Sequence, residues 1–277
     1  MWPSLKQFGA VGDGVADDTT AIVAFINALK AGPVRTGFVE SGFYRITSPL
    51  PVLDAPVTIQ GDNPQTTAFM RCFNGISKIG TFHITGGGKG ATLSRFGIVS
   101  SGTGGALIAG VSSPDLSLGT IVLEDLILTT SGSDSHENTL FFDGSARTEG
   151  AVGIRSVELR NVKAFGCTGY SADLKCVEGF KWTGGGPYGA GGTGAASGAI
   201  RVSGTPTLPS VNVSIDVDAI NYLNLTNTQR STFKAQSWGH VSGVSVANDG
   251  SVSNVMIFGN PPGLVSTNWQ SSSVYRS

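Results

Sequence analysis

The stretch that decides the fold runs from Phe8 to Ile22 and reads FGAVGDGVADDTTAI. Three glycines within Gly9–Gly14 supply turns that need a positive φ or a close approach of the backbone. Asp17 and Asp18 then offer acceptors to the first free N–H groups of a helix. We therefore assign these two acids and Asp13 to turn and cap structure rather than to a metal site.

A short amphipathic helix is predicted over residues 18–31. Apolar residues recur there at i, i+3, i+4 and i+7, which makes one stripe along the helix. They are Ile22, Phe25, Ile26 and Leu29. Lys30-Ala-Gly-Pro33 ends the helix with a cation, a glycine and a proline. Nothing comparable follows, so the remaining chain is expected to build its core from strands.

These residues resemble the N-terminal signature of a known family. Phe8-Gly-Ala-x-Gly-Asp-Gly, a two-residue spacer, Asp17-Asp18-Thr19 and the helix are similar to the start of pectate-lyase-like right-handed parallel β-helices. That form is found in bacteriophage tailspikes and in some polysaccharide-degrading enzymes. Residues 37–46 and 57–61 resemble the first rungs, with Ser41 at a tight turn where a proline is usual. The resemblance covers about residues 5–62.

The resemblance implies an all-β fold, a right-handed single-stranded parallel β-helix with an N-terminal capping α-helix. We expect the signature and capping helix over 1–36, the coil over 37–245, and a C-terminal cap or last rungs over 246–277. It further implies a phage tailspike or tail-fibre depolymerase that binds a bacterial surface polysaccharide (capsule, O-antigen or exopolysaccharide) and hydrolyses it. The alternatives are a non-catalytic glycan receptor-binding or structural β-helix tail protein, and a polysaccharide lyase. Such a spike is expected to be a homotrimer in the virion tail, beside other tail proteins.

The amino-acid composition narrows the kinds of fold and of binding partner that are expected. Glycine supplies 40 of 277 residues and charged residues only 13%, which is typical of many turns between short strands. Lys and Arg number 18 against 19 Asp and Glu, so no basic field for a nucleic acid or an anionic membrane is predicted. Three cysteines without CxxC spacing (Cys72, Cys167, Cys176) are interpreted as small buried hydrophobes. No signal peptide or membrane-spanning run is evident, which favours a virion protein folded in a host cytoplasm.

A six-residue pattern recurs after the helix: apolar, any, any, apolar, any, apolar. Copies begin at residues 79, 93, 123, 159, 177, 220, 241 and 252, at intervals of 14, 30, 36, 18, 43, 21 and 11. Such irregular spacing disfavours equal-length solenoids but suits a β-helix, whose insertions leave the coil as surface loops. Three segments, 129–149, 167–175 and 184–198, are expected to leave the repeat. Asn248-Asp-Gly250 is a hairpin signal that predicts an antiparallel cap.

Glycoside hydrolysis needs two carboxyl groups about 5–9.5 Å apart, a spacing that neighbouring rungs supply at about 4.8 Å each. Aligned by the repeat, Glu124, Arg160 and Glu178 form one outward column. They are either an acid and a base flanking an arginine, or an exposed ladder of ion pairs. A calcium-dependent lyase is less favoured; its base could be Lys163 or Lys181, which the same alignment places in one column. No cofactor and no metal ion are expected.

The loop candidates are Glu137 and Asp143, with His136 and Arg147, in the segment 129–149. Catalytic groups concentrate on loops held by a rigid scaffold, although a polar loop is more often only solvated. Asp173, just before Glu178, either faces the same groove or makes a turn.

Sugars also need flat apolar faces with polar groups at the ring edge. Trp182, Tyr188 and Trp238 are the candidates for that role, with core packing as the alternative for Trp182. His83, between Phe82 and Ile84, is interpreted as a strand residue that faces solvent.

Overall fold

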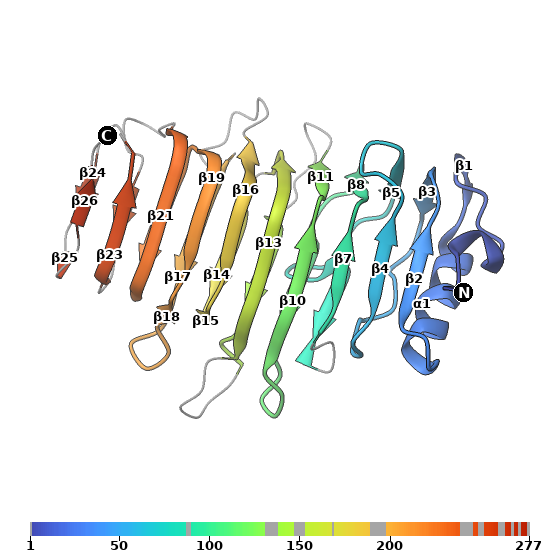
Figure 1. The fold of residues 1–277 in the computed structure, drawn as a ribbon, viewed down its shortest axis with the longest axis horizontal. Coiled ribbons are helices and arrows are strands. Elements are labelled where there is room, and N and C mark those ends of the chain that lie inside the picture. The colour runs from blue at the N-terminus through green and yellow to red at the C-terminus, as the bar shows by residue number, and fades with distance from the viewer. Residues whose placement is uncertain are drawn as a thin grey trace.

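Parallel strands stacked turn upon turn make up nearly all of the protein. The computed structural model describes residues 2–86, 90–130, 138–146, 153–167, 169–188, 198–238, 246–248, 252–259, 264–266, 269–270 and 273–275. Figure 1 shows the strands side by side along the long axis, from the blue N-terminal end to the red C-terminal end. Every strand pair is parallel, as expected for an all-β coil.

The elements of the first half are η1 (Leu5–Phe8), β1 (Asp13–Asp17), α1 (Thr19–Ala31), β2 (Thr36–Val39), β3 (Gly42–Ile46), β4 (Thr58–Gly61), β5 (Thr67–Arg71), β6 (Gly80–Thr85), β7 (Thr92–Ser94), β8 (Gly97–Ser100), β9 (Ala106–Val111), β10 (Leu118–Glu124), β11 (Ile127–Thr130) and β12 (Asn138–Asp143).

The second half contains β13 (Ile154–Phe165), β14 (Tyr170–Lys175), β15 (Val177–Glu178), β16 (Lys181–Tyr188), β17 (Ala199–Ser203), β18 (Ser210–Val211), β19 (Ser214–Ile220), β20 (Tyr222–Thr226), β21 (Thr228–Trp238), β22 (Val246–Asn248), β23 (Val252–Phe258), β24 (Leu264–Ser266), β25 (Trp269–Gln270) and β26 (Ser273–Tyr275).

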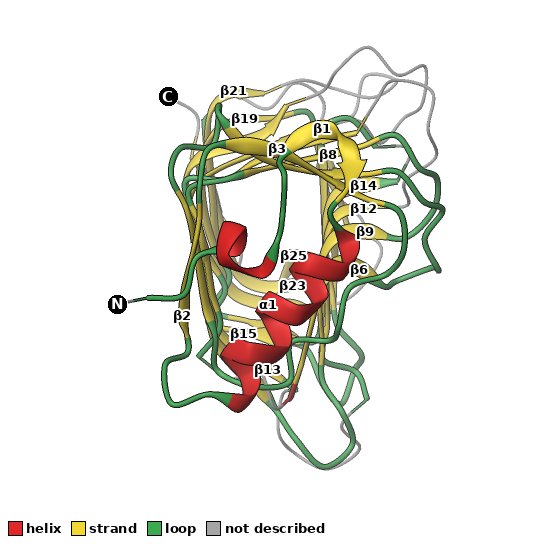
Figure 2. Cartoon of the chain, turned by 90° about the vertical axis from the view of Figure 1, so that its right-hand side faces the viewer, coloured by secondary structure: helices red, strands yellow, loops and turns green. Residues whose placement is uncertain are grey.

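Each turn of the coil passes through two sheets. An 18-stranded sheet bends around several sides, and an 8-stranded sheet (β6, β9, β12, β14, β17, β20, β22, β24) closes the remaining side. Seen from the N-terminal end, the strands form a ring (Figure 2). The strands of one side keep a constant register from turn to turn, so side chains of equivalent position lie in columns. One inward column of the large sheet is Gly37, Ile59, Leu93, Leu123, Leu159, Trp182, Ile215, Phe233 and Ile257.

The bends of the large sheet are made by residues in the left-handed region of φ. One corner column contains Arg95, Asp125, Asn161 and Gly184, each with φ between 50° and 70°. A second contains Thr120, Ser156, Gly179, Asn212, Arg230 and Asn254, with φ between 49° and 68°. The six-residue pattern of the sequence marks such bends, with the left-handed residue at its third position in most copies. Because the pattern occurs at more than one corner of the coil, its copies are unevenly spaced along the sequence, although the strands pair in a constant register.

Helix α1 closes the N-terminal end of the coil, and Figure 2 shows it lying across the ring of strands. The predicted stripe of Ile22, Phe25, Ile26 and Leu29 is buried. Gly37, at the head of the inward column, leaves room for the helix, because a Cβ there would lie 2.3 Å from the ring of Phe25. The helix thus replaces the side chains that a preceding turn would supply.

The acidic residues of the signature hold turns, as predicted, but the side chain of Asp18, at the N-cap of α1, makes no hydrogen bond to the helix. The Asp18 carboxylate accepts hydrogen bonds from the backbone N–H groups of Val11 (2.6 Å) and Gly12 (3.1 Å). Asp17 accepts one from the N–H of Thr19, and Asp13 accepts two from its own turn. Strand β1 pairs with β3, but its register shifts between Asp13 and Asp17.

The segments expected to leave the repeat contain strands instead. Segment 129–149 includes β12, segment 167–175 includes β14, and β16 extends to Tyr188. Leu140, Phe142 and Leu174 of these strands belong to the main core, while Phe141 faces the other way and packs on Ala106 and Ala109. The predicted antiparallel cap is also wrong: β22 to β26 pair parallel with earlier turns. In the described part of the chain, no helix has the length and apolarity to span a bilayer.

Thr120 offers a test of the corner geometry. A β-branched residue at φ 56° is strained, because left-handed backbone costs an L-residue about 1–2 kcal/mol. We expect Thr120→Gly to raise the free energy of unfolding by about 0.5–1 kcal/mol in urea titrations, after the entropy cost of glycine. The matched control is Thr232→Gly in the extended strand β21, which should destabilise by roughly 1 kcal/mol. Equal losses at both positions would contradict the corner assignment.

Candidate functional site

The residues predicted for the site lie on different sides of the coil. Glu124 and Arg160 are in register on β10 and β13, as aligned. Glu178 is not in their column, because it pairs with Arg155 and Val211. The six-residue pattern misplaced it because the pattern occurs at both corners. Glu178 precedes the corner of the Thr120 column, whereas Glu124 and Arg160 precede the corner of the Arg95 column. For the same reason Lys163 and Lys181 belong to different columns, beside Gly186 and Glu158 respectively.

The column of Glu124 is an exposed ladder of ion pairs. Arg160 contacts Glu124 at 3.5 Å and Glu158 at 2.7 Å, and Lys181 reaches Glu158 at 3.8 Å. The hydrogen bond and charge of Arg160 hold the pKa of the Glu158 carboxyl below its usual value. Glu178 likewise pairs with Arg155 at 3.0 Å. These contacts match the ion-pair alternative for the column, since each of these carboxylates has a cationic partner.

A different group forms on the outer face of the small sheet, at β14, β17 and β20. We call Tyr170, Asp173, Arg201 and Asn224 the β14–β17 cluster. Asp173 and Arg201 are register partners, and the guanidinium donates to both carboxylate oxygens, from Nε at 2.8 Å and from Nη2. The Arg201 Cζ lies 4.5 Å above the ring centroid of Tyr170. The Asn224 amide donates to the Tyr170 hydroxyl at 3.4 Å.

Burial makes this group unlike the exposed ladder. The Asp173 side chain is 4% exposed, whereas Arg201 remains 41% exposed. The hydrogen bonds to Asp173 raise the pKa of Arg201 above its usual value. Asn224 Oδ1 is buried and has no hydrogen-bond partner among the residues described. The cluster therefore presents a rigidly held cation at the surface, with a phenol below it and an unused acceptor beside it.

Asp143 lies one strand away from the cluster. It ends β12 in register with Lys175, whose Nζ is 3.5 Å from its Oδ2, and its Oδ1 accepts the N–H of Ser145. Because Phe141 is the register partner of Asp173, Asp143 is its diagonal neighbour on the same face. Such neighbours are about 7–8 Å apart. Of the predicted carboxylates in the described residues, these two alone share a face of one sheet as neighbours.

The aromatic candidates have other roles. Trp182 follows the core-packing alternative and not the sugar-stacking one, since it is fully buried in the inward column, between Leu159 and Ile215. Tyr188 stacks on Phe165 at 5.0 Å and donates to Asp218; burial and that carboxylate raise its pKa to about 12. Trp238 donates its indole N–H to the carbonyl of Phe258 at 3.3 Å. Both rings are half-buried outside the small sheet.

The other residues singled out from the sequence are three loop residues, His83 and the cysteines. Glu137, His136 and Arg147 lie outside the described residues. His83 is on a strand as expected, but it is half-buried, and burial lowers its pKa. Cys167 and Cys176 are buried thiols whose pKa burial raises, while Cys72 is half-buried. Within the described ranges no group of three potential ligands is close enough to hold a metal ion.

Sequence reasoning missed Arg201 and Asn224. Both follow the strand alternation, since Ile200, Val202, Leu223 and Leu225 are buried on either side of them. Reading residues 199–203 and 222–226 as paired strands would have placed Arg201 next to Asn224 on the outer face.

The two kinds of ion pair predict different energetics. Asp173→Ala leaves Arg201 without its buried partner, so we expect a loss of about 2 kcal/mol in the free energy of unfolding. Glu124→Ala in the exposed ladder should cost less than about 1 kcal/mol. Urea unfolding of both variants, and of Asp173→Ala combined with Arg201→Met, measures the coupling. Losses that simply add in the double variant would show that Asp173 and Arg201 do not act as a pair.

Comparison with known proteins gives partial likenesses. No family model matches the chain. The chain is similar to mannuronan C5-epimerase AlgE2 of Azotobacter vinelandii, with 27% identity over 172 residues, 59% of this chain and 15% of that protein. It is 41% identical to AlgE5 of the same organism over 59 residues, 21% of this chain and 6% of that protein. The chain thus spans a small part of the length of these curated relatives.

A solved structure shares the architecture. The A-module of mannuronan C-5 epimerase AlgE4 from Azotobacter vinelandii matches 99% of this chain and 97% of its own, with a TM-score of 0.54 and 14% identity. At that identity the match concerns the fold alone.

Proposed function

We propose that this protein processes a polysaccharide, and that it binds a uronate-containing chain across the β14–β17 cluster and modifies it there. The observation that carries the proposal is Arg201, fixed by Asp173 over the Tyr170 ring and still 41% exposed. A planar guanidinium is well suited to pair with the carboxylate of a sugar acid. The partial sequence likeness to mannuronan C5-epimerases supports a polyuronate such as polymannuronate as the substrate.

The chemistry follows from what a uronate needs. Removal of the C5 proton places negative charge next to the sugar carboxylate, so a cation that pairs with this carboxylate lowers the barrier. Arg201 takes that part, and the Tyr170 hydroxyl takes the part of the proton donor or acceptor. A water molecule on the opposite face of C5 serves as the other proton partner, so that the proton removed from one face is replaced on the other, which gives the epimer. Loss of the O4 substituent instead gives a cleaved chain with an unsaturated end, which is the lyase outcome.

Hydrolysis is the second candidate, favoured by one observation. Asp143 and Asp173 are diagonal neighbours, and a backbone spacing of about 7–8 Å lets two carboxyl groups on one face reach the roughly 6.5–9.5 Å separation of an inverting glycosidase. Both carboxylates are paired with cations, which weighs against an acid and a base at these positions. We therefore rank hydrolysis below uronate chemistry.

The role as a trimeric tailspike on a virion stays a proposal that rests on the N-terminal signature. We also propose that the coil is right-handed, because connections between parallel strands of one sheet are right-handed in about 98% of cases.

One assay separates the reactions. The protein is incubated with polymannuronate in D2O; NMR follows deuterium at C5 and the epimer, while absorbance of unsaturated ends and new reducing ends are followed in parallel. We expect C5 exchange, and on the order of 100-fold less of it in Arg201→Lys, because the ammonium cannot hold the bidentate geometry. Tyr170→Phe should keep binding and lose turnover.

The matched control is Arg155→Lys, the same change in an exposed ion pair on another side of the coil. It should leave turnover unchanged. New reducing ends without unsaturated product, lost in both Asp143→Asn and Asp173→Asn, would replace the uronate reaction by hydrolysis. A protein that binds no polyuronate and changes none would overturn the proposal.

A further inference from the structure

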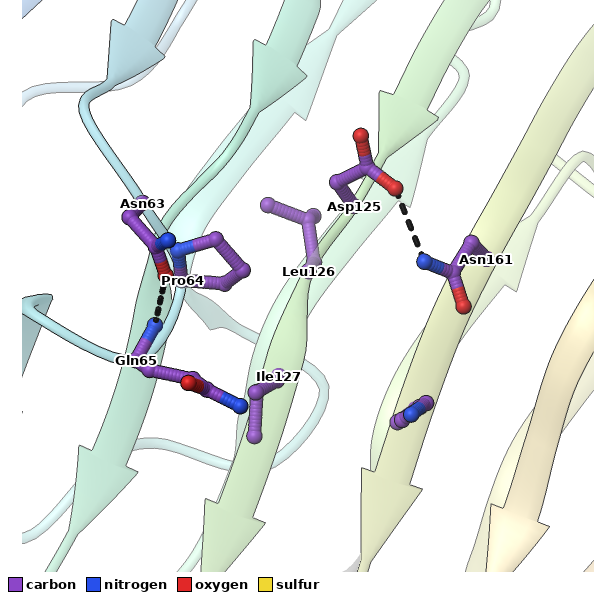
Figure 3. A pocket seen from close by; sticks show the side chains of 8 residues that line it. Asn63, Pro64, Gln65, Asp125, Leu126, Ile127 and Asn161 are labelled. Carbon is purple, nitrogen blue, oxygen red and sulfur yellow. Dashed lines mark hydrogen bonds between the residues drawn. The ribbon is translucent and has the colours of Figure 1, made fainter.

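A second site lies on the large sheet, away from the β14–β17 cluster. A cavity of about 260 Å³ opens where the loop 62–66 meets strands β11 and β13. We call it the corner pocket; Asn63, Pro64, Gln65, Asp125, Leu126, Ile127, Asn161 and Lys163 line it. Figure 3 shows Asn63, Pro64 and Gln65 on one side and Asp125 and Asn161 on the other.

The loop wall is held in place by specific contacts. Gly97 of β8 lets the loop cross above it, because a Cβ there would lie 3.1 Å from the Pro64 carbonyl. The Arg95 guanidinium donates to the carbonyl of Asp62 at 2.7 Å, and Asn63 Oδ1 accepts the N–H of Gln65 at 2.8 Å. A pocket whose wall is already ordered loses little entropy when a ligand binds.

The opposite wall is built from the corner column. Asp125 and Asn161 both have φ 50°, and the Asn161 amide donates to Asp125 Oδ1 at 2.8 Å (Figure 3). Two residues further on, β13 places Lys163 in the pocket beside Ile127 of β11. Lys163 is half-buried, and no carboxylate of the described residues forms an ion pair with it.

These groups define the ligand chemistry. Lys163 supplies a cation at one end, the carboxamides of Gln65 and Asn161 supply donors and acceptors, and Pro64, Leu126 and Ile127 add apolar surface. Such a mixture suits a polyol ring with an anionic substituent. The volume is near the lower bound of about 300 Å³ for small-molecule pockets, so one sugar unit rather than a longer segment fits.

We infer that the corner pocket binds a single carboxylated sugar unit, with the carboxylate at Lys163 and hydroxyls at Asp125, Asn161 and Gln65. Since β11 and β13 belong to the large sheet and β14 and β17 to the small one, this site is separate from the proposed reaction site. The inference does not depend on any reaction there. A second contact of this kind would tether a polymer and raise its effective concentration at the first.

Titration of isotope-labelled protein with sodium glucuronate, followed by NMR chemical shifts, tests the inference. We expect a dissociation constant on the order of millimolar and at least about tenfold weaker binding by Lys163→Met. Lys234→Met is the matched control, since it removes an exposed lysine of the same sheet outside the pocket and changes the net charge equally. It should bind as the unchanged protein does.

A second variant guards against loss of fold. Asn161→Gly keeps a left-handed corner that glycine adopts freely, while it removes the amide, so weaker glucuronate binding with an unchanged unfolding curve is expected. Glucose and inorganic phosphate serve as further probes and should each bind more weakly than glucuronate. No binding by the unchanged protein, equal binding by Lys163→Met, or phosphate binding as tight as glucuronate would each overturn the inference.

Discussion

The constant register between parallel strands is the constraint on which the rest of this structure depends. The backbone N–H and C=O groups of a strand need partners in the turns before and after it. Strands of successive turns therefore have to stay in register, although the turns differ in length. The left-handed corner residues make this feasible, because each column of them bends the large sheet at the same place in several successive turns. Insertions then fall between strands, where no ladder is broken. Columns of side chains, inward and outward, follow from this one condition.

The same condition explains why charge is distributed as it is. An outward column juxtaposes side chains at about 4.8 Å, a distance at which like charges repel and opposite charges pair. The large sheet satisfies this with exposed pairs such as Glu124 and Arg160, which contribute little. The small sheet buries Asp173 and leaves Arg201 at the surface, so one member of the pair fixes the other. Both arrangements obey one geometric rule, but in the second the buried partner holds the cation in a fixed position at the surface.

Structure could be predicted from the sequence where it depends on neighbouring residues. It could not be predicted where it depends on the register between one turn of the coil and the next. The helix, its buried stripe and the turn roles of Asp13, Asp17 and Asp18 are set by neighbours a few residues away, and all were predicted. Glu178 was misplaced because two corners share one six-residue pattern, and a single-corner error moves a side chain to another side of the coil. Asp173 was placed on a loop, facing a groove or making a turn, although it lies in strand β14, since its partner Arg201 is 28 residues further on. Register between distant turns is a property of the whole coil, and no window of sequence contains it.

Helix α1 and strand β1 have a further consequence for association. An uncovered end of a coil presents unpaired backbone groups, the template on which a strand of another molecule adds in amyloid-like growth. Here the apolar face of α1 occupies the interior at that end, and the edge strand β1 is short, irregular in register and carries Asp13 and Asp17. Short length, irregular register and exposed charged side chains are devices by which edge strands resist such addition. The N-terminal segment that resembles the family signature therefore also disfavours end-to-end polymerisation.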